Sequence, residues 1–161
     1  MIREAKESDC INLAALSMEV WLTTYSMEGI RRENSDYLLS VFTETHFKGL
    51  LANERYKLWV WVEGIYLRGY VLIDFDSRFG NGDHGFEIQR LYVHSPFQHQ
   101  GIGQNLFDHV KNRHGDRFWL YTWVKNKSIG FYKKQGLVEV GRYEFLLGDE
   151  VIENLVLAHG Q

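Results

Sequence analysis

The sequence of 161 residues lacks three features that would each have assigned it to a class of protein. Cys10 is its only cysteine, so no disulfide can form within the chain, and a reducing compartment is expected. No apolar run approaches the ~20 residues that span a bilayer, and the opening MIREAKESDC lacks the apolar core of a signal peptide. The formal net charge of −3 gives no general attraction to nucleic acid. We therefore expect a cytoplasmic protein, monomer or homodimer, that binds neither nucleic acid nor membranes.

The length fits one domain, and no repeat or linker interrupts the chain, so we expect a single domain over residues 1–161. Helical spacing predicts helices over 10–25, 35–52 (with Ser35 or Asp36 as its cap), 102–114 and 127–136. Runs rich in Val, Ile, Trp and Tyr predict strands over 1–5, 56–64, 66–75, 85–93, 116–124, 137–147 and 151–159. This order predicts a mixed sheet with helices on its faces.

One predicted strand, FEIQRLYV, has an irregular apolar pattern. Side chains alternate between the two faces of a regular strand. Phe86 and Ile88 would therefore point to one face, and Leu91 and Val93 to the other. An extra residue at Gln89 or Arg90, a β-bulge, would bring all four to one face and leave backbone groups free for an extended ligand. A strand buried on both faces explains the pattern equally well.

A glycine-rich segment, FQHQGIGQNLF, separates this strand from the next helix. A helix N-terminus has unpaired amides and partial positive charge, and glycines let an anion such as a pyrophosphate approach closely. A triphosphate loop would need lysine after Gly103, where Gln104 stands, and a dinucleotide fingerprint would want glycine near Leu106. A third pattern, Gln/Arg-x-x-Gly-x-Gly, fits at Gln98, Gly101 and Gly103.

That third pattern, with the LYV strand before it and NKSIGFYKKQGL after it, resembles the GNAT superfamily of N-acetyltransferases over nearly the whole chain. The runs FEIQRLYV, WLYTWVKN, FYKKQG and GRYEFLLGDE look like its bacterial spermidine/spermine N-acetyltransferase branch. The resemblance implies the GNAT fold, an α/β (α+β) class with a mixed, mostly antiparallel central sheet of about seven strands flanked by about four helices. It also implies acetyl-CoA as the acetyl donor.

The resemblance also implies which residues bind acetyl-CoA and which one protonates the leaving thiolate. Backbone groups of Leu91 and Val93 would hold the pantetheine arm, and Asn126 and Tyr132 would lie beside it. Tyr132 would also protonate the leaving thiolate. Glu87 is the best candidate for the base because it lies on the bulged strand opposite Phe86 and Ile88; His84 and Asp76 are weaker alternatives, and a chain of water molecules could serve instead. The pyrophosphate would be held by Gln98, His99, Gln100, Gly101, Ile102, Gly103 and Gln104.

The expected activity is direct acetyl transfer to a primary amine of a small molecule, with a polyamine-like acceptor favoured. The alternatives are a protein N-terminus, a lysine or an aminoglycoside-like drug as acceptor, or a non-catalytic module that senses CoA. The pairs His94/His99 and His109/His114 are each five residues apart, which does not place two ligands on one helix face, so no metal site is predicted. Cys10 is predicted to be a buried, small apolar residue.

Overall fold

The computed structural model describes all residues from Met1 to Gln161. The strands are β1 (Ile2–Glu4), β2 (Tyr56–Glu63), β3 (Tyr66–Asp74), β4 (Phe86–Val93), β5 (Phe118–Trp123), β6 (Val138–Leu147) and β7 (Glu150–His159). The helices are α1 (Cys10–Tyr25), α2 (Arg32–Val41), α3 (Glu44–Leu51), α4 (Ile102–His114) and α5 (Ile129–Lys134), with short 3₁₀ turns at Glu7–Asp9 and Ser95–Phe97. None of these helices has both the length and the apolar character needed to cross a membrane.

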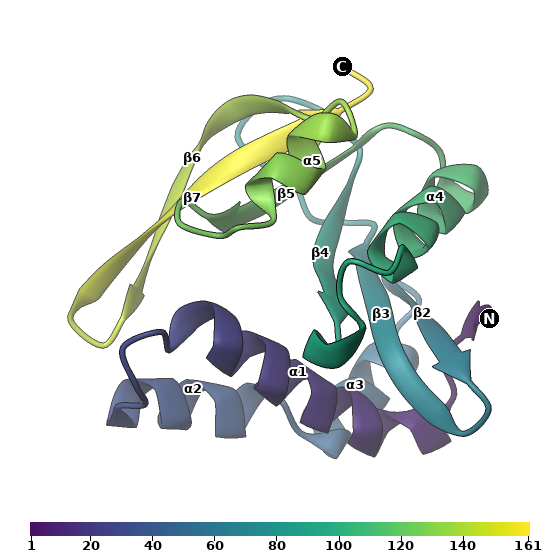
Figure 1. Cartoon of the computed structure of the whole chain (residues 1–161). Coiled ribbons are helices and arrows are strands. Elements are labelled where there is room, and N and C mark those ends of the chain that lie inside the picture. The colour runs from purple at the N-terminus through teal and green to yellow at the C-terminus, as the bar shows by residue number, and fades with distance from the viewer.

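All seven strands form one sheet, in the order β1-β2-β3-β4-β5-β7-β6. Every neighbouring pair is antiparallel except β4 and β5, which run parallel. The predicted fold class, a mixed and mostly antiparallel seven-stranded sheet with flanking helices, is confirmed. The parallel pair lies at the middle of the sheet and joins an N-terminal half to a C-terminal half (Figure 1).

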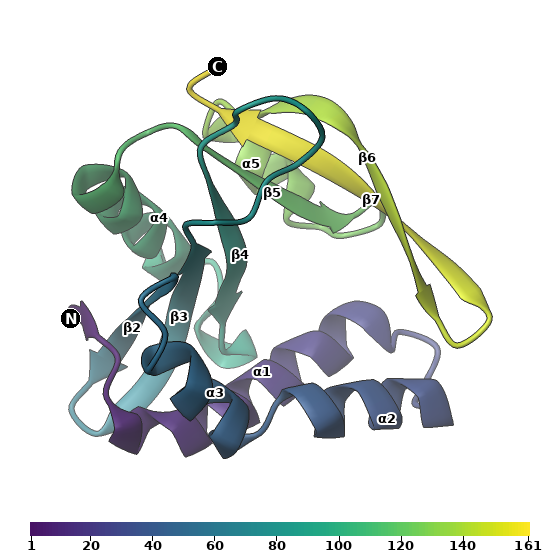
Figure 2. The same ribbon diagram turned by 180° about the vertical axis from the view of Figure 1, so that it is seen from behind.

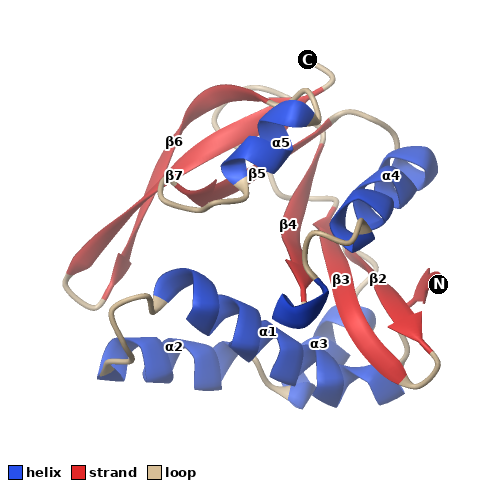
Figure 3. Ribbon diagram, viewed as in Figure 1, coloured by secondary structure: helices blue, strands red, loops and turns tan.

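Helices cover the two faces of the sheet separately (Figures 1 and 2). The α1 face is the side on which α1, α2 and α3 lie, and its core includes Leu13, Phe47 and Tyr70. The α4 face is the side on which α4 and α5 lie, and its core includes Leu106 and Phe118. Figure 3 shows the sheet between these two layers of helices. Burial of this apolar area is the main term that stabilises such a layered fold.

The prediction of one helix over 35–52 is wrong, because the segment forms two helices, α2 and α3. Phe42 leaves the helical conformation at φ −91° and ψ 75°, and Thr43 then starts a new helix. The Thr43 hydroxyl accepts a hydrogen bond from the His46 amide at 3.1 Å, as an N-cap residue does. The helix α2 begins at Arg32, so neither Ser35 nor Asp36 is its cap.

Candidate active site

The strands β4 and β5 separate soon after they meet. They pair only at Phe86–Phe118 and Glu87–Trp119, after which each strand continues without the other. From Ile88 onward β4 keeps β3 on one side, and from Leu120 onward β5 keeps β7 on the other. The facing backbone edges therefore have no strand partner, and their amide and carbonyl groups can pair with an extended ligand (Figure 1).

A β-bulge in β4 adjoins this separation. Leu72 of β3 pairs with Arg90, and the next residue, Ile73, pairs with Ile88, so Gln89 is the extra residue. The bulge interpretation of the sequence is confirmed. It places Phe86, Ile88, Leu91 and Val93 together in the core of the α4 face, and Glu87 and Arg90 on the opposite face.

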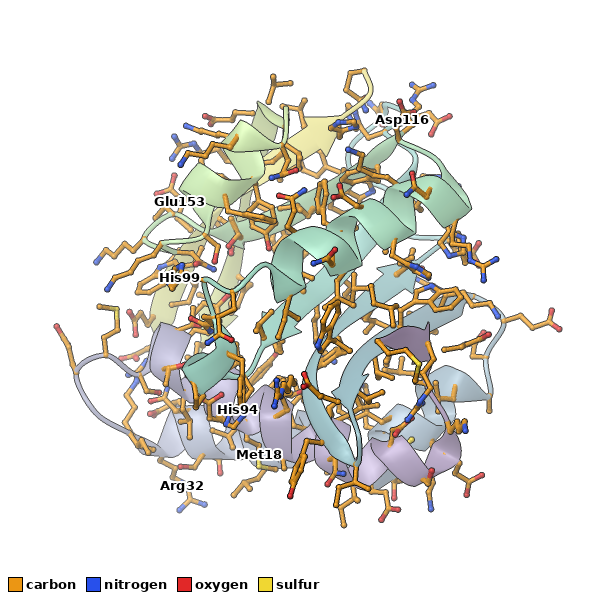
Figure 4. All side chains as sticks on the ribbon, turned by 45° about the vertical axis from the view of Figure 1, so that its right-hand side comes forward. Met18, Arg32, His94, His99, Asp116 and Glu153 are labelled. Carbon is orange, nitrogen blue, oxygen red and sulfur yellow. The ribbon has the colours of Figure 1, made fainter.

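The segment between β4 and α4 forms a cluster of free amides. The amides from His99 to Gln104 donate to no acceptor within the protein. His99 and Gly101 adopt positive φ angles, 61° and 87°, which turn the chain into the first turn of α4. Figure 4 labels His94 and His99, which mark this segment at the N-terminus of α4. Free amides at a helix start fit the negative charges of a pyrophosphate.

The other residues that we predicted to bind the acetyl donor lie around this loop. Gln98 donates through Nε2 to the carbonyl oxygen of Val93 at 2.9 Å, which fixes the loop to the end of β4. A Cβ atom on Gly103 would lie 3.8 Å from Val93 Cγ2, an ordinary contact. Gln104 pairs its side-chain amide with that of Gln135 at the end of α5. These hydrogen bonds hold the loop and the first turn of α4 against the end of β4 and the end of α5.

Tyr132 lies on α5, packed in the core of the α4 face and only 8% exposed. Burial raises the pKa of its hydroxyl to about 12, so the group keeps its proton at neutral pH. The hydroxyl has no hydrogen-bond partner and is not among the fully buried polar atoms. Its oxygen therefore borders accessible space and can donate a proton or a hydrogen bond to a ligand.

Asn126 holds the turn between β5 and α5 by its side chain. Its Nδ2 donates to the Thr122 hydroxyl at 2.8 Å, and its Oδ1 accepts from the Ser128 amide at 2.9 Å. Both ends of the side chain are thus engaged within the turn. Asn126 therefore orients the start of the helix that carries Tyr132.

A cavity of about 310 Å³ opens on the face opposite to α4. Glu87 lines it and is only 3% exposed. Burial, with a further contribution from the nearby Asp74 charge, raises the pKa of Glu87, and the Ser77 hydroxyl opposes that rise. The remaining cavity wall consists of aromatic and polar residues: Arg55, Tyr56, Asp74, Ser77, Arg78, Phe79, Gln89, Trp119, Tyr121, Tyr143 and Val156.

A second carboxylate in the cavity, Asp74, is neutralised by the protein itself. Arg55 donates to both of its oxygens, each at 2.7 Å, and the amides of Asp76 and Ser77 donate to Oδ1. Burial alone would raise the pKa of Asp74, but these donors lower it overall. Glu87 has no such ion pair, so it is the carboxylate in the cavity that can take a proton from a ligand.

The alternative bases lie outside this cavity. Asp76 is exposed, and His84 is hydrogen-bonded through Nδ1 to Gln161 at 2.6 Å. No group of three or more His, Cys, Asp or Glu side chains is arranged to hold a metal ion. Cys10 is fully buried in the core of the α1 face, as predicted.

Sequence analysis did not single out most of the cavity wall. Arg55 directly precedes β2, Asp74 is the last residue of β3, and Trp119, Tyr121 and Tyr143 come from β5 and β6. Trp119, Tyr121 and Tyr143 lie in runs that carry the family resemblance, but no role was predicted for them, and the five residues meet only through the register of the sheet. The one available signal was the parity of β4, which places Glu87 opposite to the apolar face.

Comparison with known proteins agrees with this geometry. Residues 17–137 match the model of the acetyltransferase (GNAT) family. An uncharacterised N-acetyltransferase of Lactobacillus delbrueckii subsp. lactis, named for its place in the pepI 3′ region, is 27% identical in an alignment of 157 positions that covers 92% of this chain and 90% of that protein.

Solved structures share the fold. The PaiA N-acetyltransferase of Thermoplasma acidophilum, in complex with coenzyme A, superimposes with a TM-score of 0.75 at 17% identity over 98% of each chain. The ribosomal-protein-alanine N-acetyltransferase of Brucella melitensis gives a TM-score of 0.64 at 20% identity, over 98% of this chain and 97% of that one. The chain belongs to the GNAT family of acetyltransferases, and it is an N-acetyltransferase that takes its acetyl group from acetyl-CoA.

Proposed function

We propose that the protein transfers an acetyl group directly to a primary amine held in the cavity beside Glu87, with no covalent enzyme intermediate. The observation that carries this proposal is the position of Glu87. Its carboxylate is buried, lacks an ion pair, and lies on the last residue that β4 pairs with β5 before the two strands separate. A base at that point lies between a donor on one face of the sheet and an acceptor on the other.

The donor side of the proposal uses the α4 face. Acetyl-CoA supplies an acetyl thioester. The amides from His99 to Gln104 would bind its pyrophosphate, and the free backbone edge of β4 at Leu91 and Val93 would bind its pantetheine arm. Tyr132 would hold a proton at its hydroxyl for the departing sulfur, which the raised pKa of that hydroxyl supports.

The acceptor side uses the cavity. An amine with a pKa near ~10 is mostly protonated at neutral pH and must lose a proton before it can attack. Glu87 would accept that proton, and a backbone amide of the bulge would stabilise the negative charge on the acetyl oxygen. Holding the two reactants in place can supply up to ~7–11 kcal/mol in well-oriented model systems.

A polyamine-like molecule is the first candidate for the acceptor, as the resemblance to the spermidine/spermine branch indicates. Tyr56, Trp119, Tyr121 and Tyr143 give the cavity aromatic walls beside Glu87, and aromatic faces attract ammonium groups. A second candidate, an amine that also bears a carboxylate, is favoured by one specific observation, the unpaired guanidinium of Arg90. A protein N-terminus, a lysine side chain and an aminoglycoside-like drug are the remaining acceptors.

An amine panel tests the proposal, with released CoA detected by a thiol reagent. Turnover with spermidine would support a polyamine acceptor. Turnover restricted to peptides or to drugs would instead assign the acceptor to one of those two classes. Tight CoA binding without turnover on a broad panel would contradict the catalytic proposal and favour a CoA-sensing module. We further propose that the active unit is the single domain of residues 1–161, acting in the cytoplasm as a monomer or homodimer.

A further inference from the structure

The guanidinium of Arg90, on β4 directly after the bulge, forms no ion pair, although it lies near enough to Glu87 for its charge to oppose the rise in the pKa of that carboxyl. No carboxylate forms an ion pair with Arg90, in contrast to Arg3, Arg31, Arg32, Lys48, Arg55, Lys57, Arg68, Lys111 and Arg142. Its NH1 nitrogen is fully buried without a hydrogen-bond partner. Such a group is rare, since buried charges are normally paired.

The surroundings of Arg90 are aromatic. The guanidinium carbon lies 5.0 Å from the ring centre of Phe42 and 6.0 Å from that of Phe47. Tyr70, whose hydroxyl shares a 2.6 Å hydrogen bond with Ser17, is the polar group packed against it. Aromatic faces offset part of the cost of burying a cation, but they supply no hydrogen-bond acceptor in the plane of the guanidinium.

The guanidinium also borders accessible space. Its Nε and NH2 nitrogens are not among the fully buried unpartnered atoms, although neither forms a hydrogen bond that meets normal geometry. The side chain is thus fixed on one side by the phenylalanine rings and open on another. A rigid, open, unpaired guanidinium is suited to bind a planar anion by two parallel hydrogen bonds.

The position of Arg90 relative to Glu87 sets the size of the ligand. Across the sheet Glu87 pairs with Asp74 and Arg90 pairs with Leu72, two residues farther along β3. The two side chains leave the same face of the sheet, so their Cα atoms are roughly 7 Å apart. Gln89, the bulged residue between them, lines the cavity itself.

We propose that Arg90 binds a carboxylate of the acceptor, so that the acceptor is a primary amine carrying a carboxylate a few carbon atoms away. The amine lies at Glu87 and the carboxylate at Arg90. This inference rests on the proposed function, and it takes the second candidate acceptor, an amine that also bears a carboxylate, in place of a polyamine. A carboxylate is the planar anion whose two oxygens match two parallel N–H donors of a single guanidinium.

The test compares three acceptors of the same chain length: 5-aminopentanoate, 1-aminopentane and cadaverine (1,5-diaminopentane). They differ only in the fifth carbon, which is a carboxylate carbon, a methyl group or a methylene that bears a second ammonium. The wild-type enzyme is expected to give a kcat/KM for 5-aminopentanoate at least ~10-fold above that for either of the others, as is typical of one charged hydrogen-bonded group. Equal or higher kcat/KM for cadaverine or 1-aminopentane overturns the proposal.

Variants of Arg90 locate the effect. Arg90→Met keeps an unbranched apolar side chain and removes the charge, so the preference for 5-aminopentanoate over 1-aminopentane should fall by at least ~10-fold. Arg90→Lys should restore part of it, because the charge remains without the planar fork. Arg32→Met, which alters an exposed arginine on α2, should leave the preference unchanged. A preference that survives Arg90→Met overturns the assignment to Arg90.

A binding measurement separates this proposal from the proposed function. Pentanoate, which has the carboxylate but no amine, should raise the melting temperature of the wild type and not that of Arg90→Met. If no amine is turned over, the proposed function fails, yet the pentanoate result still decides whether Arg90 holds a carboxylate. If Arg90→Met does not fold, the three-acceptor comparison on the wild type decides alone.

Discussion

The two faces of β4 differ in how their functional groups are distributed along the chain. On the α4 face, the amide loop and Tyr132 lie within one stretch from Gln98 to Tyr132. On the α1 face, the cavity collects side chains from Arg55 to Val156. The donor side is thus a local structure that a motif can describe, whereas the acceptor side exists only after the sheet has formed.

The difference follows from the chemistry that each face serves. Backbone amides bind a pyrophosphate with little dependence on side chains, so glycines and a helix start suffice. An acceptor is recognised by side chains whose positions depend on strand register, and such residues vary freely on one fold. The predictions below act on one face at a time.

Tyr132→Phe is expected to have the largest effect, and to act from the donor side. The substitution keeps the ring packing and removes one oxygen, so kcat should fall by at least ~10², within the ~10²–10⁴ typical of general acid–base groups. The dissociation constant for acetyl-CoA should stay near the wild-type value, because the interaction is made mainly in the transition state. Steady-state kinetics together with calorimetry check both quantities.

The loss of kcat in Tyr132→Phe should be the same for every amine, since the departing sulfur is common to all of them. Tyr66→Phe is the matched control, because Tyr66 is 65% exposed at the start of β3. A wild-type rate for Tyr132→Phe with the best amine would leave Tyr132 as a packed aromatic residue and assign the proton to water.

Glu87→Gln tests the acceptor side. We expect kcat/KM for the amine to fall by about 10²-fold at neutral pH, with acetyl-CoA affinity unchanged. Because burial raises the pKa of Glu87, the wild-type kcat/KM should rise with pH as the carboxyl ionises, above the usual range of a glutamate. In Glu87→Gln, the acidic limb of the profile, where kcat/KM falls as the pH is lowered, should be absent.

The pH profile is the decisive measurement for Glu87, since a merely structural role would lower the rate equally at every pH. Asp76→Asn, which changes an exposed carboxylate outside the cavity, should retain the limb and the rate. If the limb persists in Glu87→Gln, another group or a chain of water molecules takes the proton.

The sequence was sufficient for the individual strands and the loop because each depends on near neighbours, whereas the arrangement of the sheet was implied by the family resemblance. The parity change between Ile88 and Leu91 forced a choice between two explanations, and the pairing of Ile73 with Ile88 resolved it. The predicted helix over 35–52 was wrong because Thr43 caps a new helix within an apparently continuous apolar pattern. The role of Arg90 could not be read from the sequence, since the lack of a partner is a property of the folded surroundings.

Gly103→Asp acts on the binding part of the donor side. A carboxylate there would lie beside the expected pyrophosphate, and like charges about 4 Å apart in wet surroundings repel by ~1–4 kcal/mol. The dissociation constant for acetyl-CoA should therefore rise by at least ~10-fold, measured by calorimetry. The fold should tolerate the change, because Gly103 has no positive φ and an aspartate in the first turn of a helix is favourable.

Gly103→Asn separates charge from size, since it has the same shape as Gly103→Asp without the charge. It should lose much less affinity, and at saturating acetyl-CoA both variants should keep the wild-type preference among amines. Unchanged affinity in Gly103→Asp would place the phosphates away from this loop.

The smallest expected effect concerns two histidines of α4 that lie on the α4 face but outside the site. His109 packs against Trp59 with ring centres 4.4 Å apart, and His114 accepts a hydrogen bond from the indole nitrogen of Trp59 at 3.2 Å. Burial lowers the pKa of both histidines below the ordinary value of about 6.5. The unfolded chain therefore binds more protons as the pH falls through 6.5, so the free energy of unfolding should decrease between pH 7 and pH 5.5.

The melting temperature should drop over that interval, by ~2–4 °C for each 1 kcal/mol lost. His109→Leu should reduce the drop, whereas His99→Asn, an exposed position whose positive φ asparagine tolerates, should not. An equal drop in His109→Leu and in the wild type would assign the acid sensitivity to other groups.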